Sequence, residues 1–192
     1  GEGIFGVDKR GRCTFINPAA QTIFGYTEQE LKNKSIHRLT HHSYDDGSVY
    51  PEEKCPIYTA FYSGQACQID NEVFWHKNGS SFPVHYSAYP VRNARQEITG
   101  SVVIFRDITE SRAMTQELNY MASHDSLTLL LNRYSFEKCL RQAIESTQFK
   151  GTQHVVCYID LDQFKIVNDT CGHLAGDDML KLIAHLLKKN IH

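Results

Sequence analysis

The sequence contains no apolar run that approaches the ~20 residues a membrane-spanning helix needs, so we expect no membrane segment. An excess of one charge is also lacking, because 20 basic and 22 acidic side chains leave a net charge of −2. This balance argues against a general nucleic-acid or anionic-membrane binder, and we predict no nucleic-acid partner. The chain opens without methionine or a signal peptide, and we interpret it as part of a longer cytoplasmic protein, which can itself be membrane-anchored.

Paired cysteine motifs are missing as well. None of the six cysteines stands in Cys-x-x-Cys spacing, which argues against a zinc ribbon. An even count would permit disulfides, but scattered cysteines in apolar segments are more typical of free thiols in a reducing compartment. The six are Cys13, Cys55, Cys67, Cys139, Cys157 and Cys171.

Short strands and turns are indicated over the first hundred residues. We predict strands at residues 3–7 and 13–16, separated by a polar turn. Asn17 is a favoured N-cap residue and predicts a short helix over residues 17–24. The capping-box spacing of residues 27–30 predicts another brief helix.

A hairpin is the clearest local signal in the chain. Residues 68–77 and 81–90 are strand-like and are joined through Asn78-Gly79, the strongest short hairpin dipeptide. A third, strongly apolar strand is predicted over residues 98–108, and a short helix near 56–61. Alternation in the second arm places four residues on one face: Phe82, Val84, Tyr86 and Ala88. The segment therefore predicts one antiparallel sheet covered on one face by small helices.

Residues 110–123 contain no glycine or proline and predict a helix. Its apolar spacing is broken, so it is either a short coiled-coil seam or a linker helix packed on its own domain. We predict domains at residues 1–109 and 124–192, with this helix between them.

The last third of the chain changes character. A helix capped by Ser135 is predicted first, followed by an apolar run at residues 155–159 that reads as a strand buried on both faces. A second helix is predicted from about Ala175 to the chain end. The fold class is therefore α+β: an antiparallel sheet with small helices, a linker helix, and the start of an incomplete α/β sandwich.

Acidic residues follow the predicted buried strand directly. Asp160 and Asp162 would lie at its carboxyl end, where α/β sheets usually bind ligands. Their hard oxygen atoms suit Mg²⁺ together with substrate phosphates, and Lys165 supplies a positive charge nearby. Taken singly, an aspartate at a strand end is more often a cap, and a lysine is more often a solvated charge.

A second group of polar residues follows within one or two helical turns. Asn168 and Asp177 offer amide and carboxylate groups that can hydrogen-bond a guanine-like base. Gly172 and Gly176 flank His173 and are expected to let the backbone turn tightly. His173 alone is equally consistent with a helix cap.

The run Asp160-x-Asp-x-Phe-Lys-x-x-Asn-Asp-x-x-Gly-His-x-x-Gly-Asp closely resembles the opening signature of GGDEF domains, the diguanylate cyclases. The upstream segment Asp125-Ser-Leu-Thr-Leu-Leu-Leu-Asn-Arg133 resembles the same family's entry motif. The resemblance implies that two GTP molecules condense to cyclic di-GMP across a homodimer.

The resemblance also implies roles for individual residues. Asp160 would ligate Mg²⁺ through its carboxylate, and Leu161 through its backbone carbonyl. Lys165 would stabilise charge on the triphosphate, as the catalytic residue of the set. The residues implied to contact the substrate are Asn168, His173 and Asp177.

Two departures from the family pattern bear on activity. Leu129 stands where the entry motif usually has glycine, and a β-carbon there is expected to disturb a tight turn. The Gly-Gly-Asp/Glu-Glu-Phe loop is absent from these residues, so we expect this chain alone to make no cyclic di-GMP. The alternative is a degenerate GTP-binding or dimerising module that regulates a downstream cyclic di-GMP phosphodiesterase domain.

Residues 1–109 resemble a PAS sensor domain, most clearly in Phe15-Ile-Asn-Pro-Ala-Ala20 and the closing Asp107-Ile-Thr-Glu-Ser-Arg112. Its ligand stays unknown at this stage. The group His37, His41, His42 and Cys55 is consistent with a transition-metal or haem site, or with a loop that hydrogen-bonds its own turns. Trp75 and Tyr86 are consistent with flavin stacking or with core packing. A third alternative is a pocket filled by the domain's own side chains.

Overall fold

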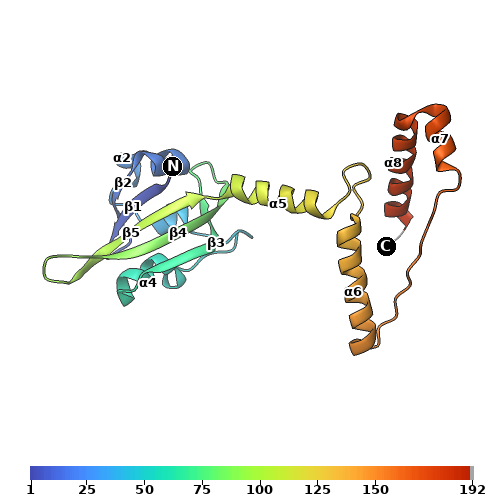
Figure 1. Cartoon of the computed structure of the whole chain (residues 1–192). Coiled ribbons are helices and arrows are strands. Elements are labelled where there is room, and N and C mark those ends of the chain that lie inside the picture. The colour runs from blue at the N-terminus through green and yellow to red at the C-terminus, as the bar shows by residue number, and fades with distance from the viewer. Residues whose placement is uncertain (191–192) are drawn as a thin grey trace. The chain divides into compact units, whose positions relative to one another are not determined.

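The computed structural model describes residues 1–190 and divides into two compact units, one over Gly1–Ala113 and one from Met114 onward. Figure 1 shows the first unit as a sheet with short helices and the second as helices only. The predicted α+β class is confirmed.

A single five-stranded antiparallel sheet forms the first unit, in the order β2-β1-β5-β4-β3. Its strands are β1 (Gly3–Asp8), β2 (Cys13–Ile16), β3 (Cys67–Trp75), β4 (Ser81–Arg92) and β5 (Ile98–Asp107). Strand β1 pairs with both β2 and β5, so the first strand of the chain lies in the interior of the sheet. The predicted strands in this unit are confirmed, with ends that differ by a few residues.

The β3–β4 hairpin confirms the turn predicted at Asn78-Gly79. Gly79 adopts a φ of 85°, the left-handed region that glycine reaches without steric cost. Asn78 Oδ1 accepts a hydrogen bond of 2.9 Å from the backbone N–H of Ser80, which closes the turn. Four alternating residues of β4 are buried, as predicted: Phe82, Val84, Tyr86 and Ala88.

Short helices contact the face of the sheet that carries these buried side chains. They are α1 (Pro18–Phe24), α2 (Glu28–Leu31), α3 (Ile36–Thr40), the 3₁₀ turn η1 (Glu52–Lys54) and α4 (Pro56–Ser63). Asn17 caps α1, because its Oδ1 accepts from the Ala20 N–H at 2.8 Å. Thr27 and Glu30 form the predicted capping box of α2.

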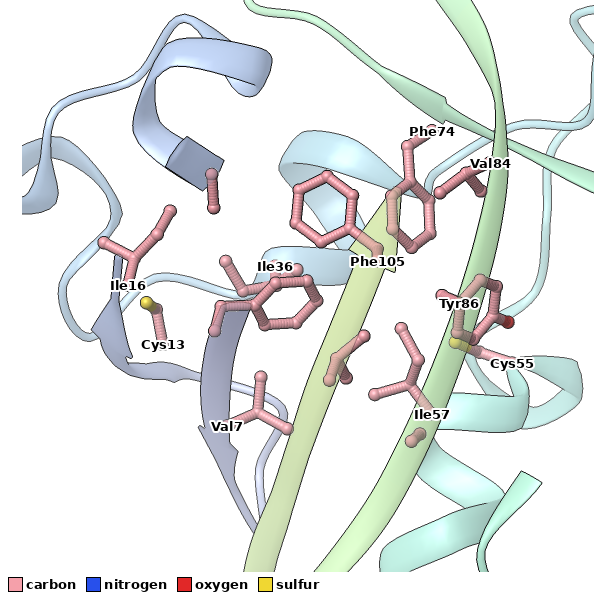
Figure 2. Close-up of a cluster of buried hydrophobic side chains, with 14 of the residues drawn as sticks. Val7, Cys13, Ile16, Ile36, Cys55, Ile57, Phe74, Val84, Tyr86 and Phe105 are labelled. Atoms are coloured by element: carbon pink, nitrogen blue, oxygen red, sulfur yellow. The ribbon is translucent and has the colours of Figure 1, made fainter. Parts of the chain in front are cut away.

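Aromatic side chains dominate the core between helices and sheet. The Phe24 ring from α1 stacks on Phe105 from β5 with centroids 4.7 Å apart, and Phe5 lies against both rings. Figure 2 shows Phe74, Phe105 and Tyr86 in this buried cluster. Each such side chain contributes about 1.5–3 kcal/mol when removed from water, so the first unit has a substantial core of its own.

The second unit contains helices without a sheet among its described residues. Helix α5 (Thr109–Ser123) leads into it, followed by α6 (Arg133–Lys150), α7 (Phe164–Cys171) and α8 (His173–Asn190). The helix predicted over residues 110–123 is confirmed as α5. The N-cap predicted at Ser135 is wrong, because Asn132 Oδ1 accepts from the Ser135 N–H at 3.0 Å and α6 begins at Arg133.

The buried strand predicted over residues 155–159 is also wrong. These residues have no regular secondary structure, and Val155 and Tyr158 are 89% and 98% exposed. All five strands described within residues 1–190 belong to the first unit, so this apolar run has no neighbour to pair with. A strand needs partners for its backbone N–H and C=O groups, and an apolar sequence alone cannot provide them.

Candidate functional site

The motif segment 160–177 folds as a tight helical corner in the second unit. Helices α7 and α8 are joined by Gly172 alone, which adopts φ 84° and ψ 161°. This conformation is open essentially only to glycine, because any Cβ would clash with the backbone. The Gly172 N–H donates to the Asn168 carbonyl at 2.9 Å, which ends α7 at the corner.

Close packing across the corner involves Asn168 and Gly176. A Cβ built on Gly176 would lie 1.9 Å from Asn168 Oδ1 and 3.3 Å from the Phe164 ring. Gly176 is buried within α8, so the tight turn predicted for it is wrong; Gly172 makes the turn. Gly176 instead allows α7 to approach α8, and so brings Asn168 next to the turn that carries Asp177.

The structure thus places Asn168 against Gly176, the residue that precedes Asp177. Asn168 and Asp177 are both half-buried at this corner, whereas His173 is exposed where α8 begins. Lys165 is exposed on the first turn of α7. Within residues 1–190, none of these four side chains makes a hydrogen bond or an ion pair.

The two implied metal ligands precede the corner. Asp160 is exposed, and its side chain makes no hydrogen bond within the described part of the chain. The carbonyl of Leu161 accepts a turn hydrogen bond of 3.3 Å from the Phe164 N–H. Without a paired strand at 155–159, the predicted position of Asp160 at a strand end is not formed in this unit.

The entry segment 125–133 forms a hydrogen-bonded loop before α6. Asp125 Oδ1 accepts from the backbone N–H and the hydroxyl of Thr128, at 2.9 and 2.8 Å, and these bonds lower the pKa of Asp125. Leu129 adopts a φ of 54°, the left-handed region that favours glycine. The disturbance expected at Leu129 is therefore wrong, because the loop keeps its turn and the leucine takes a backbone conformation that suits glycine.

A separate polar cluster lies buried in the first unit. His37 and His41 on successive turns at α3, with Cys55 immediately before α4, offer ligand atoms that all lie within 4.8 Å of one another. Their side chains are 0–4% exposed. His41 Nδ1 lies 3.3 Å from Cys55 Sγ, while burial raises the pKa of the Cys55 thiol to about 12 and lowers the pKa of His37.

Glu72 of β3 is the acidic centre beside this cluster. Its carboxylate accepts from the hydroxyls of Tyr50 at 2.7 Å and Tyr86 at 2.6 Å, and lies 3.1 Å from His41 Nε2. Burial works to raise the pKa of Glu72, but the bonds from His41, Tyr86 and Tyr50 outweigh it and hold that pKa below its ordinary value.

Sequence reasoning found three members of this cluster and missed the fourth. Glu72 stands two residues before buried Phe74, and period-two alternation would have placed it on the same inward face. His42 does not join the cluster, because its ring stacks on Trp75 with centroids 5.0 Å apart. Trp75 also donates to the Ser43 carbonyl at 2.9 Å, and Tyr86 is a fully buried core residue, as the core-packing alternative expected.

Comparisons with known proteins agree with the two family resemblances seen in the sequence. Residues 1–110 match the PAS domain family, and residues 122–192 match the family described as diguanylate cyclase, GGDEF domain. The chain belongs to the PAS domain family and continues into part of a GGDEF domain.

Relatives of the PAS–GGDEF chain include proteins on both sides of cyclic di-GMP chemistry. A probable diguanylate cyclase of Escherichia coli, DgcE, is 39% identical over 97% of this chain, and a cyclic di-GMP phosphodiesterase of Shewanella oneidensis, PdeB, is 42% identical over 97%. This chain spans only 17% and 20% of their lengths. A solved PAS domain from Colwellia psychrerythraea aligns with 57% of this chain and 87% of its own, at 18% identity and a TM-score of 0.47.

The GGDEF segment fits Mg²⁺ in the chemistry of its donors. A carboxylate at Asp160 and a carbonyl at Leu161 are the hard oxygen ligands that Mg²⁺ prefers. They are incomplete in number, because within residues 1–190 no group of three acidic, histidine or cysteine side chains gathers there.

Among all the helices of residues 1–190, none combines the length and apolar character required to cross a bilayer.

Proposed function

We propose that the protein containing this PAS–GGDEF module is a signalling enzyme that converts two GTP molecules into cyclic di-GMP under control of the PAS domain. In that reaction each 3′-hydroxyl attacks the α-phosphate of the other GTP, so that two phosphodiester bonds form and two pyrophosphates leave. The two substrates are held by two copies of the chain, which makes a homodimer in the cytoplasm the expected working form.

The corner between α7 and α8 is the observation that supports this proposal. Gly176 lets the Asn168 amide approach the turn of α8 that carries Asp177. A guanine presents N–H donors to a carboxylate and a carbonyl acceptor to an amide N–H₂, and adenine lacks this pattern. Asn168 and Asp177 would therefore select guanine, and His173 would line the same site.

The residues proposed to contact the phosphates lie N-terminal to the corner. Asp160 and the Leu161 carbonyl would hold Mg²⁺, which when bound stabilises negative charge on the phosphate oxygens. Lys165 lies on the first turn of α7 with an exposed ammonium group, and it would compensate charge on the leaving pyrophosphate.

A nucleotide-binding measurement on this chain tests the guanine site. We expect the chain to bind GTP in preference to ATP in a calorimetric titration, and Asp177→Ala to weaken GTP binding about 10-fold or more. Asp178→Ala is the matched control, since Asp178 is the next residue and pairs only with Lys181 among the described residues. Equal loss in both variants, or equal affinity for ATP, would overturn the proposal.

A second function is favoured by Leu129 and by the phosphodiesterase relative. In this reading the GGDEF part binds GTP without turnover and regulates a downstream phosphodiesterase domain. Assays on the full-length protein separate the two functions. Formation of cyclic di-GMP from GTP supports the cyclase, whereas hydrolysis of cyclic di-GMP that accelerates when GTP is added supports the regulatory module.

A further inference from the structure

The buried group of His37, His41 and Cys55 is arranged as a ligand set without a role in the guanine site. We propose that it binds one transition-metal ion of the Zn²⁺ class inside the PAS domain, through both imidazole Nδ1 atoms and the Cys55 thiolate. Glu72 and the Tyr50 carbonyl act behind the ligands and orient the two histidines.

Polar contacts on the far side of each imidazole ring support this assignment. His37 Nε2 lies 2.8 Å from the Tyr50 carbonyl, which can only accept, so Nε2 carries the proton and Nδ1 keeps its lone pair. His41 Nε2 lies 3.1 Å from the Glu72 carboxylate without the alignment of a hydrogen bond, and the neighbouring negative charge favours a proton on Nε2 in this ring as well. Histidines that bind metals usually donate their other ring N–H to a carbonyl or carboxylate in this way.

The lone pair of His37 has no partner in the described structure. Its Nδ1 is buried and makes no hydrogen bond, although the residue is only 4% exposed. A buried polar atom without a partner costs about 1–3 kcal/mol, and such atoms are rare in folded proteins. A cation beside Nδ1 would remove this cost.

Distances within the group are close to those of a bound ion. With bonds of about 2.0–2.1 Å to nitrogen and 2.3 Å to sulfur, tetrahedral ligand atoms lie roughly 3.5 Å apart. His41 Nδ1 and Cys55 Sγ are 3.3 Å apart, and no pair in the group exceeds 4.8 Å. Side-chain movements of about 1 Å would therefore bring the three ligand atoms to the spacing of a bound ion. In the metal-free protein the Cys55 thiol proton lies between Sγ and His41 Nδ1, and metal binding would release that proton to solvent.

The chemical type of the three ligand atoms indicates which class of metal ion the group binds. Two imidazole nitrogens and one thiolate suit Zn²⁺, Co²⁺ and related ions, whereas Mg²⁺ and Ca²⁺ take oxygen ligands. Three protein ligands leave one coordination position for water or a small ligand. A cavity of about 200 Å³, lined in part by His41, Tyr50 and Glu72, lies next to the group.

Cobalt titration of the whole 192-residue chain tests the site directly. After removal of metal with a chelator under reducing conditions, we expect Co²⁺ to bind one per chain. Binding is followed by thiolate-to-cobalt charge-transfer absorption in the near ultraviolet and by visible ligand-field bands typical of four-coordinate cobalt. Zn²⁺ should displace Co²⁺ and raise the melting temperature of the chain.

Single-residue variants identify which side chains bind the ion. Cys55→Ser should abolish the charge-transfer band, whereas Cys67→Ser, which removes the half-buried thiol at the start of β3, should leave it unchanged. His42→Ala is the control for loss of a neighbouring imidazole, because His42 faces Trp75 instead. Glu72→Gln should weaken binding by about 10–100-fold while the band keeps its position.

Two results would overturn the proposal. One is the absence of a one-to-one charge-transfer band in the unaltered chain, and the other is a band that survives Cys55→Ser and so belongs to exposed thiols. If Cys55→Ser does not fold, X-ray absorption of the zinc-loaded unaltered chain decides the matter. A shell with two nitrogens and one sulfur supports the site, and a shell without sulfur contradicts it.

Discussion

Asn168 on α7 lies so close to Gly176 on α8 that a Cβ at Gly176 would come 1.9 Å from the Asn168 side-chain oxygen. The glycine is inside a helix and has ordinary helical φ, so its small size, rather than its backbone freedom, is what the corner requires. The packing of Asn168 at the corner therefore depends on the small size of Gly176.

Gly176→Ala is expected to push α7 away from α8. The clash should lower the free energy of unfolding of this unit by roughly 1–3 kcal/mol, the usual cost of overpacking. Hydrogen exchange of the α7 amides would report the loosening. The double variant Asn168→Ala/Gly176→Ala removes the clashing oxygen and should recover most of the loss; an unperturbed Gly176→Ala chain would contradict the close approach.

Leu129→Gly is expected to stabilise the entry loop. A leucine at φ 54° costs about 1 kcal/mol relative to glycine in the same conformation, and Leu129 is 48% exposed, so little burial is lost. We expect protection of the loop amides from exchange to rise. Leu131→Gly is the matched control, because Leu131 is similarly exposed at 46% but does not have positive φ, and it should lower protection.

Exposed apolar residues at 155–159 are expected to make the chain self-associate. Val155 and Tyr158 are almost fully exposed in an unpaired extended segment, which is a template for pairing with another copy. Tyr158→Lys should reduce the concentration dependence of light scattering. Gln153→Lys adds the same charge just outside the apolar run and should have a much smaller effect; equal effects would point to charge alone.

Acid should weaken the contact between α2 and the β3–β4 turn. The hydrogen bond and ion pair from Lys77 lower the pKa of Glu30 from 4.5 to about 2. A lowered folded-state pKa means that this contribution is fully present above pH 4.5 and is lost as the pH falls towards 2.

Glu30→Gln separates this ion pair from the helix cap. The amide oxygen of glutamine can still accept from the Thr27 N–H, so the cap is kept while the contact with Lys77 is lost. The melting-temperature difference between the unaltered chain and the variant should therefore shrink between pH 4.5 and 2. Glu28→Gln, in the same helical turn but without an ion pair among residues 1–190, should show no such trend. A constant Glu30→Gln difference would exclude the linkage.

The sequence alone determined the local features of this protein, because each depends on neighbouring residues. The cap at Asn17, the capping box at Thr27, the turn at Gly79 and the inward face of β4 all follow from side-chain spacing and backbone preference. The motif 160–177 likewise predicts that its polar residues form one site, and that stays a prediction.

Only the tertiary structure decided where distant residues meet. The strand predicted at 155–159 failed because pairing requires a second strand that the apolar sequence cannot specify. The packing of the helices and β3 selected His37, His41, Cys55 and Glu72 for one buried cluster, and turned His42 to Trp75. Such convergence depends on contacts across up to 35 residues of chain, from His37 to Glu72, which no local pattern encodes.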